Sequence, residues 1–260
     1  VEPKHFQGWI DWAKQNGMKL DFNSTSFTHP KSGSLSLSNP DPEIRSFWIE
    51  HTKRCRAIAE EMGKAQGDPC IMNVWVHDGS KDLTVNRMKY RELLKDSLDK
   101  IFEQKYDNMK DCIESKVFGI GLESYTVGSN DFYIGYGTSR GKIVTLDTGH
   151  FHPTEIVADK LSSLLLFIPE VMLHVSRPVR WDSDHVTIMN DETQELMKEI
   201  VRCDALKGLV SKESPVGKAI LGRKVGDTVT VRVSDTNSYH AEILSIEKQA
   251  DDGSAPLRSF

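Results

Sequence analysis

Residues 70–76 read Cys-Ile-Met-Asn-Val-Trp-Val, a short and almost continuous apolar run. An amphipathic stretch from about Pro42 to Met62 precedes this run, and Asp41 is a plausible helix N-cap before it. Apolar residues recur near helical spacing along the stretch, so we expect one face of a helix to be covered by other parts of the chain. A helix followed by a short buried strand is typical of an α/β fold.

The same alternation of strand and helix continues in both directions from residues 70–76. Upstream, residues 19–23 predict a strand. Downstream we expect, in chain order, a helix at 87–104, strands at 116–122 and 142–147, a helix from 154, a strand at 171–175 and a helix from 191. About five such strand–helix units predict a parallel sheet covered by helices, either doubly wound or closed as a barrel. Functional residues would then lie at the carboxyl ends of the strands.

The pattern changes after Leu206. Residues 229–233 and 240–246 alternate with period two around a polar turn at 234–238, which predicts an antiparallel hairpin. Residues 251–260 are rich in Asp, Gly, Ser and Pro and are expected to form a loose tail. We therefore predict two domains, 1–206 and 207–260.

The composition is that of a globular protein. The 260 residues include 33 Lys and Arg against 38 Asp and Glu, for a net charge of −5, and no basic stripe predicts direct binding to nucleic acid. No apolar run reaches the ~18 residues of a membrane span. The chain begins Val-Glu-Pro-Lys, with neither a signal sequence nor an initiator Met, so its N-terminus is interpreted as a cut.

The chain has four scattered cysteines, namely Cys55, Cys70, Cys112 and Cys203. They form no C-x-x-C pair, so they predict neither a zinc ribbon nor a disulfide framework. This usage fits a reducing compartment, and we expect a cytoplasmic protein.

Side chains that can bind metal gather at the predicted strand ends. They occur in four segments: Glu-Ser-Lys at 114–116, Asp-Thr-Gly-His at 147–150, His174, and Asp-Ser-Asp at 182–184. Any single Asp or His at such a place is more often a cap or a turn former. Together they favour a metal site, because buried charges without a partner are costly. Carboxylates with imidazoles and no thiolates favour Mn²⁺, Mg²⁺, Co²⁺ or Zn²⁺, and more than four ligands suit two ions better than one.

Five sequence segments carry a resemblance to a known family. They are LDFN at 20–23, MNVW at 72–75, ESK at 114–116, LDTGHFHP at 146–153 and HVSRPVRWDSDH at 174–185. Over about residues 3–205 the chain resembles L-rhamnose isomerase, and the last segment is very specific to that family. The resemblance implies a TIM-type (β/α)8 barrel that holds two divalent ions, usually Mn²⁺.

The resemblance also implies a role for each residue of the ligand cluster. One ion is bound by Glu114, Asp147 and His174, and the other by His150, Asp182 and Asp184. The family interconverts L-rhamnose and L-rhamnulose; one ion holds substrate hydroxyls while the other helps to move hydrogen between C1 and C2.

The remaining site residues implied by the resemblance contact the sugar. Lys116 is expected to stabilise oxyanion charge, and it joins the three ligands of the second ion as a catalytic residue. A hydride shift, which needs no base, and an enediol route, which needs one, are both compatible with these residues. Trp75 and Phe27 match positions that line the family's sugar pocket, where aromatic faces suit the methyl group of a deoxysugar. Trp75 could equally serve only to pack the barrel.

The chain covers only the middle of such an isomerase. The regions with the first two strands and the eighth strand have no counterpart, so we expect an incomplete barrel with two open sheet edges and poor stability alone. The eighth strand also supplies an Asp that completes the first metal site in the family. The intact family is a cytoplasmic tetramer, and part of its subunit contacts are expected to be lost.

The C-terminal segment resembles a different family. Residues 210–222, VSKESPVGKAILG, are followed by KVGD at 224–227 and by the predicted hairpin. Over about 208–260 they resemble the FKBP-like C-terminal domain of Gre-type transcript cleavage factors, which docks on RNA polymerase. The acidic coiled coil of those factors is absent, so no cleavage-stimulating activity is implied. Two partial domains joined without a linker suggest a fusion, a rearranged reading frame or an assembly artefact.

The sequence therefore supports three hypotheses of function. The first is an L-rhamnose isomerase segment, impaired unless another chain supplies the absent strands. The second is a module that docks on RNA polymerase through its tail. The third is a nonfunctional chimera.

Overall fold

The computed structural model describes residues 2–82, 85–116, 124–152, 154–177, 186–203, 205, 219–220, 222–232 and 238–243. The chain divides into two compact units, Val1–Ala205 and Leu206–Phe260. The first unit holds alternating strands and helices, and the second holds a hairpin.

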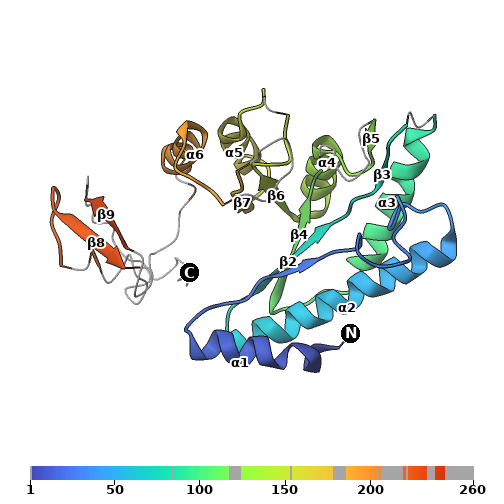
Figure 1. Ribbon diagram of the computed structural model, residues 1–260, viewed down its shortest axis with the longest axis horizontal. Helices are drawn as coiled ribbons and strands as arrows, with labels where there is room; N and C mark the ends of the chain where they lie inside the picture. The colour runs from blue at the N-terminus through green and yellow to red at the C-terminus, as the bar shows by residue number, and fades with distance from the viewer. Residues whose placement is uncertain are drawn as a thin grey trace. The chain divides into compact units, whose positions relative to one another are not determined.

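A parallel sheet of five strands forms the centre of the first unit (Figure 1). Its strands are β1 (Phe22–Ser24), β2 (Cys70–Trp75), β4 (Met109–Glu114), β6 (Ile143–Asp147) and β7 (Val171–His174). The order in the sheet is the order along the chain, and all four neighbouring pairs are parallel. A doubly wound sheet reverses its strand order at a switch point, whereas the wall of a β/α barrel does not. The five described strands show no such reversal.

Helices connect the strands and pack against the sheet (Figure 1). They are η1 (a 3-10 turn, Pro3–Phe6), α1 (Gln7–Gln15), α2 (Pro42–Gln66), α3 (Arg87–Ile101), α4 (Asn130–Arg140), α5 (Val157–Leu165) and α6 (Asp191–Arg202). Helix α2 packs against β1, β2 and β4, α4 against β4 and β6, and α5 against β7. A short antiparallel pair, β3 (Gly79–Ser80) with β5 (Tyr125–Thr126), joins the loops that follow β2 and β4.

Alternation along the strands gives the sheet one apolar and one polar face. The residues that face the helices are buried in the main core, and they include Met72, Val74, Ile113, Val144 and Leu146. The residues of the opposite face are also buried, but most of them are polar, and they include Asn73, Glu114, Thr145 and Asp147. Because buried polar groups require partners, the second face is organised by hydrogen bonds instead of by apolar packing.

The expected helix at 42–62 and the strand at 70–76 are confirmed as α2 and β2. Asp41 caps α2, since its side chain accepts a hydrogen bond of 2.8 Å from the backbone N–H of Glu43. Gly67 ends the helix with a φ of 66°, a left-handed conformation that favours glycine. The other expected helices and the strands at 142–147 and 171–175 are confirmed with small changes at their ends.

Of the expected strand at 116–122, the structure describes only Lys116, which is not part of a strand. The strand in this part of the chain is β4, which ends at Glu114; Lys116 lies beyond it, and residues 117–122 lie outside the described part. The sequence did not predict β4, because Lys110 and Asp111 break the apolar pattern. Both charges are neutralised by ion pairs with distant residues, which the local sequence does not reveal.

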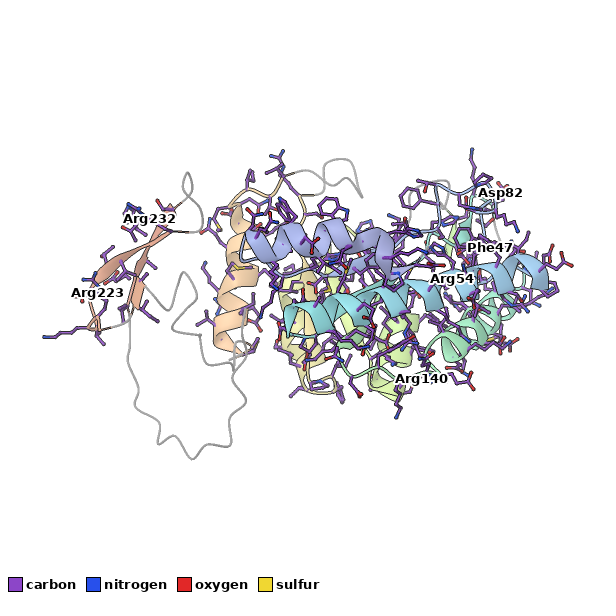
Figure 2. All side chains as sticks on the ribbon, turned by 90° about the horizontal axis from the view of Figure 1, so that it is seen from below. Phe47, Arg54, Asp82, Arg140, Arg223 and Arg232 are labelled. Carbon is purple, nitrogen blue, oxygen red and sulfur yellow. The ribbon has the colours of Figure 1, made fainter. Side chains whose placement is uncertain are left out.

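The sequence did not predict helix α4. Its glycines, Gly135 and Gly137, lower the intrinsic helix propensity. Gly137 is needed, because a Cβ there would lie 2.7 Å from Cγ2 of Val144 on β6. Glycine therefore allows the helix to approach the sheet closely. At the end of α4, Arg140 (Figure 2) pairs with Asp99 of α3 at 2.7 Å.

In the second unit, β8 (Thr228–Arg232) and β9 (Ser238–Glu242) form the predicted antiparallel hairpin. Strand β9 begins at Ser238 instead of residue 240. Figure 2 labels Arg223 and Arg232 in this unit. Residues 234–237 of the predicted turn and the predicted tail at 251–260 lie outside the described residues. Across the described ranges, no helix is long and apolar enough to cross a membrane.

Candidate metal centre

Four potential metal ligands meet at the carboxyl ends of three neighbouring strands. Glu114 is the last residue of β4, Asp147 the last of β6 and His174 the last of β7. His150 lies in the turn that follows β6. Asp147 and His174 are direct register partners in the sheet. Parallel strands thus bring together residues that are far apart in the sequence. The sequence predicted this cluster, because the potential ligands follow the ends of successive strands.

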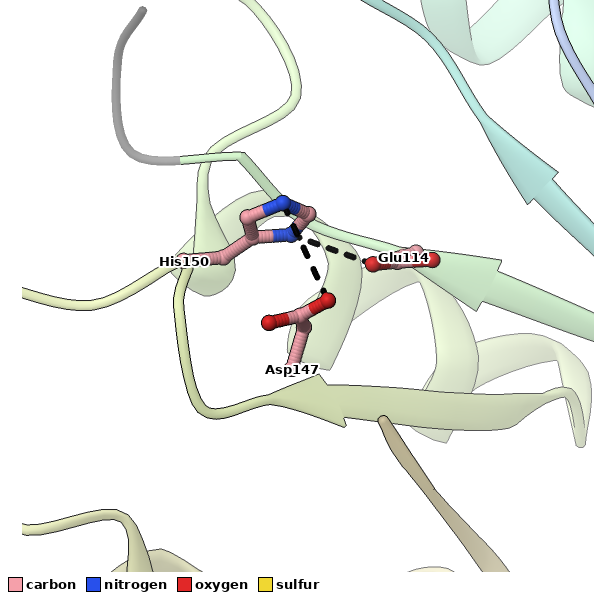
Figure 3. Close-up of side chains that lie close together, drawn as sticks. All are labelled: Glu114, Asp147 and His150. Carbon is pink, nitrogen blue, oxygen red and sulfur yellow. Dashed lines mark ion pairs between the residues drawn. The ribbon is translucent and has the colours of Figure 1, made fainter. Parts of the chain in front are cut away.

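Three of these residues, Glu114, Asp147 and His150, have ligand atoms that lie close enough to share an ion (Figure 3). Nδ1 of His150 is 3.1 Å from Oε1 of Glu114, and Nε2 of His150 is 3.9 Å from Oδ2 of Asp147. Nδ1 of His174 is 3.2 Å from Oε2 of Glu114 and 3.7 Å from Oδ2 of Asp147. Ligands bound to one ion at about 2.0–2.2 Å lie roughly 3 Å apart, so these separations fit a coordination shell.

The Asp147 carboxylate is oriented by two further hydrogen bonds. Its Oδ1 accepts from the backbone N–H of Gly149 at 2.6 Å and from the Ser176 hydroxyl at 3.1 Å. This leaves Oδ2 on the side of the two histidines. A Cβ at Gly149 would lie 2.8 Å from Oγ of Ser176, so only glycine fits this turn without a shift of its neighbour.

The electrostatic environment differs between the two carboxylates. Burial raises the pKa of Glu114, but hydrogen bonds and charges from His150 and His174 outweigh burial and hold this pKa at about 2. Burial also raises the pKa of Asp147; the His150 charge opposes this effect and the Glu114 charge reinforces it, so that this pKa is raised. Among the described residues, the ionic partners of both buried carboxylates are imidazoles. A divalent cation would satisfy both of them, and the donor set fits such a group.

Lys116 and two aromatic residues extend the cluster. The Lys116 side chain is buried, and its Nζ lies 5.5 Å from the centre of the Trp75 ring. Trp75, the last residue of β2, also stacks on His150 with ring centres 6.5 Å apart. Phe27 meets Trp75 edge-on at 5.4 Å. The structure therefore places Lys116, Trp75 and Phe27, all predicted site residues, next to the ligand cluster.

Asp78 anchors the loop that carries Phe27. Its carboxylate is fully buried and accepts four hydrogen bonds of 2.5–2.7 Å, from the backbone N–H groups and hydroxyls of Ser36 and Ser38. His77 adds contacts to Ser26 at 3.1 Å and to the carbonyl oxygen of Gly33 at 2.9 Å. The loop is thereby fixed to the end of β2. The sequence analysis did not single out Asp78, whose role depends on a loop about 40 residues upstream.

Two predicted site residues, Asp182 and Asp184, lie outside the described residues. Asn73, in contrast, was not predicted but contacts Glu114 directly. A weak signal exists in the sequence. Asn73 is the polar residue within an apolar strand, two positions before Trp75, which places both side chains on the same face.

The fold is that of an α/β protein with a parallel sheet, and it is similar to the folds of two solved sugar epimerases. A solved D-tagatose 3-epimerase-like protein shares this fold with a TM-score of 0.60 at 15% identity, over 78% of this chain and 73% of that one. D-psicose 3-epimerase, crystallised in the presence of D-fructose, gives a TM-score of 0.54 at 13% identity, over 87% of this chain and 77% of that one. At these identities the likeness concerns the fold alone.

The sequence defines the family more narrowly. The family described as L-rhamnose isomerase (RhaA) matches residues 1–214, and the chain belongs to this family. L-rhamnose isomerase of Bacteroides thetaiotaomicron is 82% identical over 207 residues, which are 80% of this chain and 50% of that protein. The Salmonella paratyphi B enzyme is 52% identical over 205 residues, 78% of this chain and 49% of that protein. The chain therefore spans about half the length of these curated relatives.

The resemblance of the C-terminal segment is also found. The C-terminal family of the transcription elongation factors GreA/GreB matches residues 183–248. This match overlaps the end of the isomerase match and covers the described hairpin of β8 and β9.

Proposed function

We propose that the chain carries the metal-binding part of an aldose–ketose isomerase that interconverts L-rhamnose and L-rhamnulose. The observation that carries this proposal is the convergence of Glu114, Asp147, His150 and His174 at the carboxyl ends of adjacent parallel strands. That edge is where barrel enzymes place their active sites. Membership of the L-rhamnose isomerase family supports the choice of substrate.

In this proposal two ions are held by the four described ligands together with Asp182 and Asp184, which lie outside the described residues. Glu114, Asp147 and His174 bind one ion, and His150 binds the other together with Asp182 and Asp184. The close approach of His150 to Glu114 and Asp147 is consistent with two neighbouring ions in one cluster. Oxygen and imidazole donors suit Mn²⁺ first, with Zn²⁺, Co²⁺ and Mg²⁺ as alternatives. Bound there, an ion supplies Lewis acid polarisation of sugar oxygens.

The side chains around the cluster have separate tasks. Lys116 brings positive charge to the oxygens on which negative charge develops while hydrogen moves between C1 and C2. Trp75 and Phe27 offer an aromatic corner to the apolar side of the deoxysugar. The nearness of Lys116 to the Trp75 ring supports a role for both groups beside the same part of the substrate. These residues serve a hydride shift and an enediol route equally well.

We further propose that the sheet is part of an incomplete (β/α)8 barrel and that the intact protein is a cytoplasmic tetramer. Support for the barrel comes from the parallel strand order, which follows the chain, and from the likeness to barrel-type epimerases. A reducing compartment is consistent with free cysteines, of which Cys55, Cys70 and Cys112 are buried.

The first test is calorimetric titration of Mn²⁺ into the purified chain. Asp182→Ala with Asp184→Ala removes two proposed ligands, whereas Asp96→Ala with Glu103→Ala removes two exposed acidic groups and serves as the matched control. We expect tight binding by the wild-type chain and the control, and strong loss in the ligand variant. Ketose formation is then measured with and without the remainder of the Bacteroides thetaiotaomicron relative. Equal binding by all three proteins would contradict the proposed ligands.

The two other hypotheses make different predictions. Docking on RNA polymerase through the FKBP-like tail has the GreA/GreB match at 183–248 in its favour, but the isomerase match is longer and includes the ligand cluster. Retention of polymerase in a pull-down, lost without residues 207–260, would support docking. A flat thermal melt with strong dye binding and no Mn²⁺ binding would support a nonfunctional chimera.

A further inference from the structure

Asn73 lies on the polar face of the sheet, below the ligand cluster. It is in the middle of β2, only 1% exposed, and its register partners are Asn23 on β1 and Cys112 on β4. Because Asn73 precedes Trp75 by two positions, its side chain shares the face that presents Glu114. The residue is thus buried within the sheet, and Glu114 lies between it and the two histidines.

Asn73 makes three side-chain hydrogen bonds. Its Nδ2 donates to Oε2 of Glu114 and, at 3.1 Å, to Oδ1 of Asn23. Its Oδ1 accepts from the Thr145 hydroxyl at 2.9 Å. The orientation of the amide follows from chemistry: an ionised carboxylate only accepts hydrogen bonds, so the amide nitrogen must face Glu114. Both amide N–H groups and the amide oxygen therefore have partners.

Thr145 is itself held in place by Cys112. The Thr145 hydroxyl oxygen lies 2.9 Å from the Cys112 sulfur, and both residues are fully buried. A hydroxyl that donates to Asn73 can accept from a thiol at the same time. The hydrogen-bonded chain therefore crosses β1, β2, β4 and β6, and it fixes the Asn73 amide from two sides.

These contacts determine how Glu114 presents its oxygens. Oε2 is bound by Asn73 and lies 3.2 Å from Nδ1 of His174, while Oε1 lies 3.1 Å from Nδ1 of His150 and 3.3 Å from Nδ1 of His174. The last torsion of a glutamate side chain is broad, so a carboxylate without such a partner would sample several orientations. Partners of this kind typically change metal affinity by a factor of about 10–100.

We propose that Asn73 is a positioning residue of the metal centre: it holds Oε2 of Glu114 so that Oε1 is directed to the ion, and Thr145 with Cys112 holds Asn73. The inference rests on the proposed function, because it assigns a role toward the ion that Glu114 would bind. Asn73 itself does not contact the ion or the sugar.

The chain contains a matched control for this contact. Asn108 donates from Nδ2 to Oε1 of Glu60 at 2.9 Å, and its backbone N–H donates to Oε2 at 2.8 Å. This second Asn–Glu pair lies just before the first residue of β4, at the opposite end of the strand from Glu114. Asn108→Ala therefore removes a similar pair without touching the ligand cluster.

Mn²⁺ affinity is measured by calorimetry on the full chain. We expect Asn73→Ala to weaken binding about 10–100-fold, Thr145→Val to weaken it less, and Asn108→Ala to leave it unchanged. In a Glu114→Ala background, Asn73→Ala should cause no further loss, because its effect passes through Glu114. Unchanged affinity in Asn73→Ala, or the same loss with and without Glu114, would overturn the inference. If the alanine variant does not fold, Asn73→Ser takes its place, since serine is polar but too short to reach Glu114.

A second measurement separates this inference from the proposed function. If the wild-type chain binds no Mn²⁺, the proposed function fails, and thermal unfolding of the metal-free chain then decides the Asn73 contact. We expect the losses in Tm of Asn73→Ala and Glu114→Ala to be non-additive in the double variant. Additive losses would mean that Asn73 does not hold Glu114, and the inference would be rejected.

Discussion

The two ends of strand β4 each bury a carboxylate, and they neutralise it in opposite ways. Near the amino end, Asp111 is bound by the Arg56 guanidinium at 2.7 and 3.0 Å and by Nζ of Lys142 at 2.6 Å. Arg56 is 1% exposed and also donates to the carbonyl oxygens of Ile101 and Gln104. This end of the strand carries its own permanent cations.

At the carboxyl end, Glu114 meets no lysine or arginine at ion-pair distance among the described residues, and its ionic partners are His150 and His174. Imidazoles are positively charged only when protonated, and they bind metal only when neutral. One strand therefore shows both solutions to the burial of a carboxylate. Where the protein supplies permanent cations, the ion pair has a structural role. Where it supplies imidazoles, the carboxylate can also bind an external cation.

The largest expected effect comes from removing the permanent cation that pairs with Asp111 near the amino end of β4. Arg56→Ala leaves Asp111 without its bidentate partner in a buried site and should lower the free energy of unfolding by about 3–5 kcal/mol. Arg54→Ala, on the exposed side of α2 (Figure 2), removes only a surface pair with Glu50 and should cost below ~1 kcal/mol. Urea denaturation of both variants measures the difference. Similar losses in both would contradict a structural role for the Arg56 network.

The second largest effect on the free energy of unfolding is expected when a metal cation is supplied at the carboxyl end of β4. Mn²⁺ at 100 times its Kd should raise the free energy of unfolding by about 2.7 kcal/mol, because the ion binds the folded state. Urea titrations with Mn²⁺ and with EDTA measure this shift. It should disappear in Glu114→Ala and persist in Asp96→Ala, an exposed acidic residue of α3. A shift that survives in Glu114→Ala would place the ion elsewhere.

A third, smaller effect concerns the loop beside the carboxyl end. Asp78→Ala removes the acceptor of four hydrogen bonds from Ser36 and Ser38, and we expect a loss of about 2 kcal/mol in the free energy of unfolding. Limited proteolysis should then cut the loop that carries Phe27 faster, while Mn²⁺ affinity is unchanged. Asp82→Ala, at a nearby exposed position (Figure 2), is the control and should change neither. An unaltered cleavage rate in Asp78→Ala would argue against anchoring.

The smallest effect concerns a half-exposed carboxylate that, like Asp111, is matched by a permanent cation. Arg140 and Lys95 hold the pKa of Asp99 below its ordinary value near 3.8. A depressed pKa contributes stability above the ordinary value, and this contribution is lost as the pH falls below about 3.8 toward the folded-state pKa. Asp99→Asn should therefore lower Tm at pH 7 by an amount that corresponds to less than ~1 kcal/mol, and the difference from wild type should vanish in acid. Thermal melts between pH 2 and pH 7 test this; a constant difference would exclude an ionic origin.

The sequence predicted those parts of the fold whose signal is local. Helix α2 has the predicted cap at Asp41, and the apolar run at 70–76 contains the buried strand β2. The cluster of ligands was predictable because parallel strands end at one edge, so chemistry that follows each strand meets there. Asp182 and Asp184 belong to the same prediction and keep the status of a proposal.

The features that escaped prediction depend on distant partners. Strand β4 contains charged residues whose ion pairs come from elsewhere in the chain, and α4 contains glycines that its contact with Val144 requires. Asn73 looks like a polar interruption of an apolar run until Glu114 and Thr145 are placed beside it. In each case the local pattern is overruled by a contact that only the folded chain makes.

The order of strands in the sheet has a consequence for synthesis on the ribosome. Each strand pairs with the strand that leaves the exit tunnel just before it, so the sheet can grow by addition at one edge without waiting for a distant segment. The four described ligands lie between Glu114 and His174, on the last three strands of this sheet. During synthesis, β1, β2 and α2 therefore leave the ribosome before His174, the last of the four described ligands, and the complete cluster can form only after most of the sheet has emerged.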